Sequence, residues 1–305
     1  MSSANVLFLF IMMIGPVLSL VSSSWVLAWL GVELAFFGLI PLMISGKYFS
    51  ISKEATLKYF CIQALSSALL FVSGMLIFFN FNMYVELIFL LSLCLKLGLF
   101  PGHFWVPSIV SGLDWFPCLL LLTWQKIAPL AFLVLCVNLN DMMSSHYFLV
   151  LGGLSALVGG MIGNNLHSVR GMIGASSVSH MGWTVLGSIS GGMWLYFFLY
   201  CGVLFLTLGY LWNSHFLSSI SILSLSGIPP FAMFVGKWSV ISNAIAAGVG
   251  AHFLVLPILG SLLSLVFYLK FMYTFYLNEV KSVLSVELLP LALLNFGGLG
   301  YLLMT

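Results

Sequence analysis

The sequence predicts an all-α polytopic membrane protein with about 11 transmembrane helices. Of its 305 residues, 62% are hydrophobic and only 5% are charged, whereas soluble domains carry about 25% charged residues. A soluble protein with so few charged side chains could not cover this much apolar surface. Apolar runs close to the ~20 residues that cross a bilayer follow one another along the chain. They leave no separate aqueous domain to bind a nucleotide or nucleic acid.

Polar residues and Gly/Pro interruptions divide the apolar sequence into eleven predicted spans. They cover residues 4–21, 25–44, 55–78, 84–109, 116–137, 146–163, 169–189, 191–212, 216–248, 251–277 and 283–303. The fourth and ninth spans are too long for a simple crossing, and both contain glycine and proline. The first six residues have no basic side chain, and no small-residue cleavage site follows. We therefore expect no removable targeting segment, and insertion into a bacterial plasma membrane or into an organelle with its own genome.

Loop charges favour one orientation of these spans. An odd number of spans puts the termini on opposite sides, and the loops on the N-terminal side contain Lys47, Lys53, Lys58, Arg170 and Lys281. The loops on the other side contain no Lys or Arg. Because Lys and Arg favour the cytoplasmic or matrix side, we expect the N-terminus there and the C-terminus on the opposite side.

A shared pattern in the fourth and ninth spans predicts an internal repeat. The segments "KLGLFPGHFWVP" and "LSLSGIPPFAMFVGKW" align after a shift of 129 residues, which pairs Gly98 with Gly227 and Pro101 with Pro230. Five spans separate them, so they cross the membrane in opposite directions. This is typical of two five-helix inverted-topology repeats, each with a broken helix, which transporters use to build midplane ion sites. Two unrelated proline kinks are the alternative interpretation.

This repeat implies one membrane domain over residues 1–305. The first repeat would cover about residues 4–137 and the second about residues 146–277. A final helix would cover about residues 283–303.

Four ionisable residues, Glu33, Lys96, Lys126 and Lys237, fall near the middle of predicted spans. Each costs roughly 2.5–3.5 kcal/mol on insertion scales. Glu33, Lys96 and Lys126 lie too far from either end of their spans to reach the interface, so they must face one another, backbone carbonyls or water. Glu33 is the one predicted buried acid, which makes it the natural partner of a buried lysine. Because the protonation of a buried lysine responds to a neighbouring carboxylate, the set predicts a proton relay. Metal-cation transport would need clustered oxygen ligands instead.

Local sequence supports polar surroundings for two of these lysines. Lys96 lies in the last turn before the break in the fourth span, where a cation would meet the negative end of a half-helix and its free carbonyls. Pro129 has no N–H to donate to the carbonyl of Gln125. That oxygen, next to Lys126, is therefore free to hold a water molecule.

The histidines leave alternatives open. His180, in "GASSVSHMGW", lies in the seventh span close to three serines, and is either a hydrogen-bonded core residue or a proton relay. His103, just past the first break, has the same two interpretations. A haem site is disfavoured, because His167 and His180 would need an opposing pair on another helix.

The cysteines predict no metal, iron–sulfur or disulfide site. They are scattered singly, without a CxxC motif or a Cys/His cluster. They are Cys61, Cys94, Cys118, Cys136 and Cys201.

Four segments, taken in order, resemble the motifs of mitochondrially encoded NADH dehydrogenase subunit 2, an antiporter-like membrane chain of respiratory complex I. They are "KLGLFPGHFWVP", "LLLLTWQKIAPL", "RGMIGASSVSHMGW" and "LSLSGIPPFAMFVGKW". The resemblance rests on specific motifs over residues 25–238, and on hydropathy alone in the last third. Short length and eleven spans resemble the animal form, which lacks three N-terminal helices of its bacterial relatives.

Carried over to this sequence, the resemblance implies a role for each buried charge. Glu33 and Lys96 would form a coupling pair, Lys126 would be the central lysine of a hydrophilic axis, and Lys237 the terminal lysine on the second broken helix. The chain departs from the family at Ser108, where an acid usually follows "HFW-x-P". It also has Phe-Pro-Gly-His at residues 100–103 in place of Ala-Pro-Phe-His. No role can be carried over for the missing acid.

The implied function is proton translocation by a membrane-arm subunit of NADH:ubiquinone oxidoreductase in the mitochondrial inner membrane, with the C-terminus in the intermembrane space. This chain would bind no cofactor, and NADH, FMN, iron–sulfur clusters and ubiquinone are expected in other subunits. Its partners would be other membrane-arm subunits, including neighbouring antiporter-like chains, and lipids, but no nucleic acid. The alternatives are another antiporter-like complex I subunit, an Mrp-type cation/proton antiporter subunit, and a pump-inactive scaffold.

Overall fold

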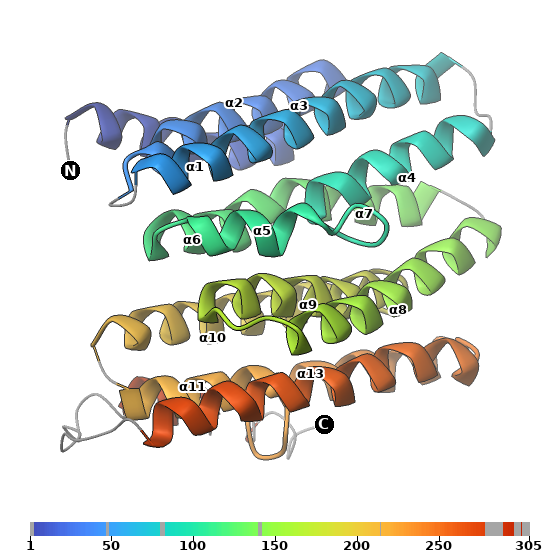
Figure 1. Cartoon of the computed structure of the whole chain (residues 1–305). Helices are drawn as coiled ribbons and strands as arrows, with labels where there is room; N and C mark the ends of the chain where they lie inside the picture. Colours follow the sequence, from blue (N-terminus) through green and yellow to red (C-terminus); the bar gives the residue numbers. More distant parts are fainter. Residues whose placement is uncertain are drawn as a thin grey trace. The chain divides into compact units, whose positions relative to one another are not determined.

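The computed structural model describes residues 3–46, 49–79, 83–139, 142–213, 215–277, 289–295 and 300. Within these residues the regular secondary structure is entirely helical, which confirms the predicted all-α class. The chain divides into two compact units, Met1–Asn140 and Asp141–Thr305, drawn in blue to green and in yellow-green to red in Figure 1.

The first unit contains seven α-helices and one short 3-10 helix among its described residues. They are α1 (Ser3–Val21), α2 (Trp25–Ile44), α3 (Phe49–Phe79), α4 (Met83–Leu97), α5 (Trp105–Gly112), α6 (Trp115–Leu122), the 3-10 helix η1 (Trp124–Lys126) and α7 (Ile127–Leu139). α1 and α2 are in backbone contact, because a Cβ added to Gly15 would lie 2.6 Å from the backbone nitrogen of Ala35. Small residues allow such close approach between membrane helices. The pair gives the first unit a tightly packed frame.

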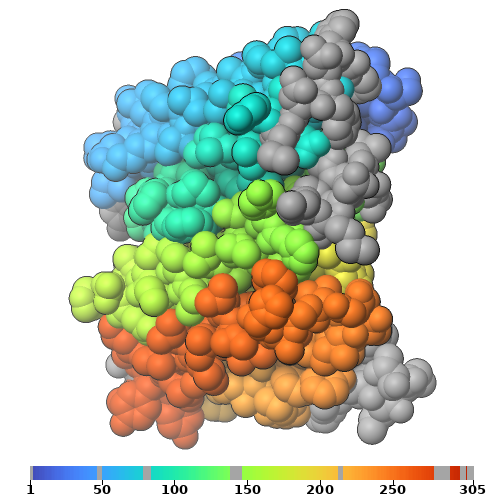
Figure 2. All heavy atoms as spheres, turned by 90° about the vertical axis from the view of Figure 1, so that its right-hand side faces the viewer, coloured from blue at the N-terminus to red at the C-terminus, as the bar shows by residue number. Residues whose placement is uncertain are grey.

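The described part of the second unit centres on a buried helix. Its helices are α8 (Met142–Asn164), α9 (Val169–Ser190), α10 (Met193–Asn213), α11 (His215–Ser226), α12 (Ala232–Ala246) and α13 (Ala251–Leu277). Every residue of α9 from Gly171 to Gly187 is buried. α13, in the orange part of Figure 2, exposes apolar side chains such as Val255, Leu262 and Val266. Such an uncovered apolar side fits contact with lipid.

Every predicted span up to residue 277 coincides with a helix or with consecutive helices. Seven helical stretches in the described residues are long and apolar enough to cross a membrane, with the consecutive elements α6, η1 and α7 counted as one. The two broken spans consist of shorter helices, and α9 is rich in serine and glycine, so the total of eleven stays a prediction. Most of the predicted span 283–303 lies outside the described residues. Its helical part, 289–295, contacts α12, because Asn295 Oδ1 accepts a hydrogen bond from the Ala232 N–H at 3.0 Å.

α3 begins at Phe49, earlier than the predicted residue 55, so Lys53 and Lys58 lie on its first turns rather than in a loop. Both lysines are exposed, and the Lys58 ammonium pairs with the Glu54 carboxylate at 2.7 Å. Lys47 and Lys281 fall outside the described residues.

Both broken spans are interrupted directly after a half-helix. A loop separates α4 from α5, and another separates α11 from α12 (Figure 1). Gly98 follows α4 with a φ of 73°, and Gly227 follows α11 with a φ of 74°. These values lie in the left-handed region, which glycine adopts without a steric penalty. The two half-helices therefore end in the same backbone conformation.

Candidate functional site

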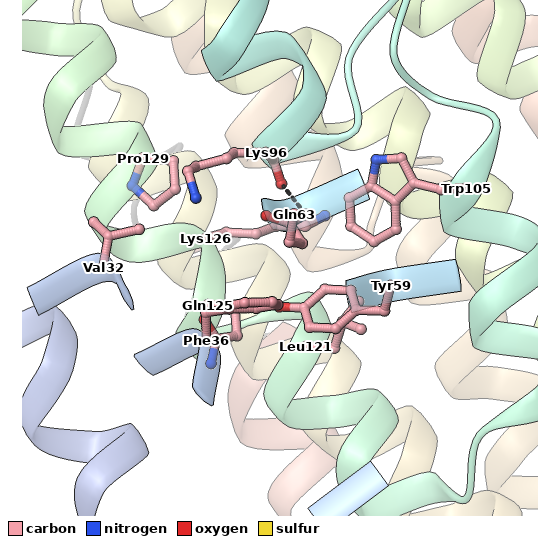
Figure 3. A pocket seen from close by; sticks show the side chains of 10 residues that line it. All are labelled: Val32, Phe36, Tyr59, Gln63, Lys96, Trp105, Leu121, Gln125, Lys126 and Pro129. Carbon is pink, nitrogen blue, oxygen red and sulfur yellow. Dashed lines mark hydrogen bonds between the residues drawn. The ribbon is translucent and has the colours of Figure 1, made fainter. Parts of the chain in front are cut away.

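A small buried cavity in the first unit brings two of the predicted lysines together. Its lining residues are Val32, Phe36, Tyr59, Gln63, Lys96, Trp105, Leu121, Gln125, Lys126 and Pro129 (Figure 3). About 20 Å³ is open to the centre of a water molecule, which is room for roughly one water. Because amide, hydroxyl and ammonium groups line it, a water there would find the polar partners it needs.

Lys96 lies in the last turn of α4 and is only 6% exposed. Neutral side chains satisfy two carbonyls at this helix end. Gln63 Nε2 donates to the Lys96 carbonyl at 3.4 Å, drawn as a dashed line in Figure 3, and Trp105 Nε1 donates to the Leu95 carbonyl at 2.9 Å. These donors reach in from α3 and α5. The sequence predicts instead that the lysine cation itself meets the free carbonyls.

Lys126 lies at an interruption that the sequence analysis did not predict. The fifth predicted span consists of α6, η1 and α7, and the Lys126 N–H donates to the Thr123 carbonyl at 3.2 Å in a 3-10 pattern. Pro129 removes the helical hydrogen bond to the Gln125 carbonyl. The side chain of the same residue makes a separate contact, because Gln125 Nε2 donates to the Ala35 carbonyl of α2 at 2.7 Å. The turn is thereby fixed to the α1–α2 frame, with Lys126 at the cavity (Figure 3).

Glu33 is buried on α2, beside this cavity rather than in its wall. Its neighbours on the helix, Val32 and Phe36, line the cavity. The Glu33 carboxylate interacts electrostatically with Lys96 and with Tyr59, but these described side chains form no Glu33–Lys96 ion pair within 4.0 Å. Glu33 Oε1 is buried without a hydrogen-bond partner in the described residues. Glu33 and Lys96 thus form no ion pair in the described part of the chain, and their role as a coupling pair stays a prediction.

His103 is buried but does not line this cavity. Its ring packs against Phe100 and Phe104, with centroid separations of 5.9 Å and 4.0 Å. Within the described chain, its Nδ1 has no hydrogen-bond partner. Ser108, at the position of the family's usual acid, is exposed and donates to the Trp105 carbonyl at 2.9 Å.

In the second unit, Lys237 reaches the end of a broken helix. It is buried on α12, and its Nζ donates to the carbonyl of Ser226, the last residue of α11, at 2.7 Å. A cation is favourable at a helix C-terminus, where carbonyls lack helical partners. From the sequence, this kind of contact is predicted for Lys96 at the first break.

His180 joins three helices of the second unit. Its Nδ1 lies 2.7 Å from the Tyr196 hydroxyl of α10, and its Nε2 lies 3.1 Å from the Tyr268 hydroxyl of α13. A neutral imidazole donates through one nitrogen and accepts through the other. The arrangement fits both interpretations. Both ring nitrogens have hydrogen-bond partners, as in a core histidine, and the ring links the two tyrosine hydroxyls in a continuous chain, as in a proton relay.

Comparison with known proteins gives the family. Residues 22–218 match the family described as "NADH:quinone oxidoreductase/Mrp antiporter, TM". The chain is 35% identical over 290 residues to NADH-ubiquinone oxidoreductase chain 2 of Albinaria caerulea, covering 93% of each protein. The chain belongs to the NADH-ubiquinone oxidoreductase chain 2 family. The family predicted from the four motifs is therefore confirmed.

Solved structures share the fold of this chain 2 family member. A chain of respiratory complex I from Thermus thermophilus with bound aureothin has a TM-score of 0.82 at 22% identity, covering 97% of this chain and 79% of that one. A chain of the Mrp complex from Dietzia sp. DQ12-45-1b has a TM-score of 0.80 at 19% identity, covering 91% and 61%. These likenesses show that the chain shares its fold with both solved chains.

Several polar residues around the cavity and around His180 were not predicted from the sequence. Gln63 and Gln125 both donate to backbone carbonyls of neighbouring helices at the cavity. An amide inside an apolar span, as in "FCIQALSS", is a signal that could have identified Gln63. Tyr196 and Tyr268 carry no such signal, because tyrosines are common in membrane helices and their contact with His180 arises only from packing.

Proposed function

We propose that this chain is a proton-translocating subunit of the membrane arm of respiratory complex I. As a chain 2 family member with helices that can cross a bilayer, it is a multi-pass protein of the mitochondrial inner membrane. The observation that carries the proposal is the cavity shared by Lys96 and Lys126. Two buried lysines around a water-sized space are costly in a membrane unless they serve a polar pathway.

In the proposed relay, Glu33 and Lys96 form the coupling pair. A change of charge at one changes the proton affinity of the other, since the two interact electrostatically across the α2–α4 region. A proton then passes between Lys96 and Lys126 through water in the cavity. Lys237 serves as the terminal lysine in the second unit, and His103 and His180 are further candidates for proton transfer.

The energy for this transfer would come from redox chemistry elsewhere in the complex. The chain has no redox site of its own in this proposal, and NADH, FMN, the iron–sulfur clusters and ubiquinone belong to other subunits. Its partners would be other membrane-arm subunits, neighbouring antiporter-like chains among them, and membrane lipids.

The organisation proposed for this function is a pair of inverted repeats. Residues 4–137 and 146–277 would form the repeats, and residues 283–303 a final helix. The matching left-handed glycines after α4 and α11 support this assignment. The exposed Lys53 and Lys58 at the start of α3 support an N-terminus in the matrix and a C-terminus in the intermembrane space.

An Mrp-type antiporter subunit is the second candidate, favoured only by the shared fold. Identity to a chain 2 protein over nearly the whole length favours complex I instead. A pump-inactive scaffold is the third, and its buried lysines would be purely structural.

Replacing Lys96 tests the proposal. Lys96→Met, in complex I reconstituted into vesicles, should assemble normally but translocate fewer protons at a slower rate of quinone reduction. Lys58→Met is the matched control, because Lys58 is exposed and its ammonium pairs with Glu54 of its own helix. Full pumping by Lys96→Met would contradict a relay through this cavity.

A further inference from the structure

The two helix breaks have the same backbone conformation but differ in what fills the space beside the glycine. A Cβ added to Gly98 would meet the Cγ2 methyl of Val106. A Cβ added to Gly227 would meet Lys237, at 2.8 Å from Nζ, 2.9 Å from Cε and 3.0 Å from Cδ. In the second break, the lysine side chain therefore occupies the space that any other residue at 227 would fill.

Lys237 uses this space to reach a backbone oxygen. Its Nζ donates to the Ser226 carbonyl at 2.7 Å, directly next to Gly227. In the first break, the corresponding helix end is satisfied by the neutral donors Gln63 and Trp105. The last carbonyl of α11 is therefore bound by a side chain that can carry a proton. Gly227 leaves the space in which that lysine side chain lies.

We propose that Gly227 is a positioning residue for proton transfer at Lys237. Because Gly227 has no Cβ, the Lys237 side chain can lie across the break. In that position its ammonium group donates to the Ser226 carbonyl. This inference rests on the proposed function, in which Lys237 is the terminal lysine of the relay. It assigns a role to a residue that carries no proton itself.

The geometry also predicts which part of the molecule would move if a side chain were added. The atoms nearest to the new Cβ belong to the far end of a long, flexible side chain and not to backbone. The lysine would therefore give way, while α11 and α12 keep their places. Gly227→Ala should displace the proton carrier from its oxygen without removing it.

Gly248→Ala is a matched control in the same unit. Gly248 has a φ of 72°, close to that of Gly227, but nothing lies within 4 Å of an added Cβ. Both alanines impose the same left-handed backbone penalty, and only the one at residue 227 reaches Lys237. A difference between the two variants therefore reports on the lysine and not on backbone strain.

The test compares both variants in the complete complex I, reconstituted into vesicles. We expect equal assembly of Gly227→Ala and Gly248→Ala, and a proton-coupled rate of quinone reduction about tenfold lower in Gly227→Ala alone. Loss of one hydrogen bond from a charged donor produces a ratio of this order. Equal rates in the two variants would overturn the inference.

A double-mutant cycle separates positioning from a merely structural role. If Gly227 acts through the lysine, Gly227→Ala should add no further loss to Lys237→Met. Additive losses would overturn the inference. Full pumping by Lys237→Met would overturn the relay itself and the inference with it, whereas impaired Lys237→Met beside normal Gly227→Ala would overturn the inference alone.

Discussion

Replacing Gln125 by Met should loosen the 3-10 turn that carries Lys126. The change removes the amide that donates to the Ala35 carbonyl at 2.7 Å, and it keeps an unbranched side chain of similar length. Interhelical hydrogen bonds in a membrane protein average about 0.6 kcal/mol and reach about 1.7 kcal/mol. We therefore expect the turn to open about 3-fold more often, and at most about 18-fold.

The loss should stay local to the turn. The Ala35 end is fixed by the backbone contact between α1 and α2, where the Cβ of a substituted Gly15 would have no room. Amide hydrogen exchange in the assembled complex measures the opening directly. The amides of Gln125, Lys126 and Ile127 should exchange faster in Gln125→Met than in the native chain.

Asn164→Leu provides the control for this experiment. Asn164 Nδ2 also donates to a backbone carbonyl of another helix, that of Leu263, at 3.3 Å, but in the second unit. This variant should leave exchange at the Lys126 turn unchanged. Native exchange rates at the turn in Gln125→Met would refute the idea that the side chain fixes Lys126.

Two further predictions concern the second unit and the membrane topology. His180→Ala leaves the hydroxyls of Tyr196 and Tyr268 without their ring partner, and one such loss costs about 1–3 kcal/mol. The thermal midpoint of the assembled complex should fall, and an unchanged midpoint would contradict a tightly bonded core histidine. A protease added to mitoplasts should cleave a tag on the C-terminus and spare one on the N-terminus. Cleavage of the C-terminal tag from the matrix side alone would rule out the proposed orientation.

Apolar runs and helix breakers made much of the fold predictable. The bounds 25–44 and 251–277 agree with α2 and α13, because each run is mostly apolar over at least 20 residues and ends at a polar or glycine-containing segment. The two broken spans were visible for a similar reason. Glycine at Gly98 and Gly227 marks positions where the backbone can leave the helix.

The fine structure around the lysines depends on contacts between distant residues and was not predictable. The 3-10 turn at Lys126 is fixed by Gln125 reaching Ala35, 90 residues away in the sequence. A cation at a helix break was expected for Lys96, but the structure shows that contact for Lys237. The difference arises because Gln63 and Trp105 already donate hydrogen bonds to carbonyls at the end of α4. The positions of these two side chains follow from packing rather than from local sequence.

The most direct test of the relay is the proton-to-electron ratio of complex I that carries Lys126→Met. Met keeps an apolar stem without the titrating group, and loss of a buried charge should not prevent folding. We predict normal assembly, fewer protons translocated and slower quinone reduction. Lys126→Arg should be equally impaired, because a guanidinium does not release its proton. A native ratio and rate in the Met variant would contradict proton transfer through Lys126 and would favour the scaffold.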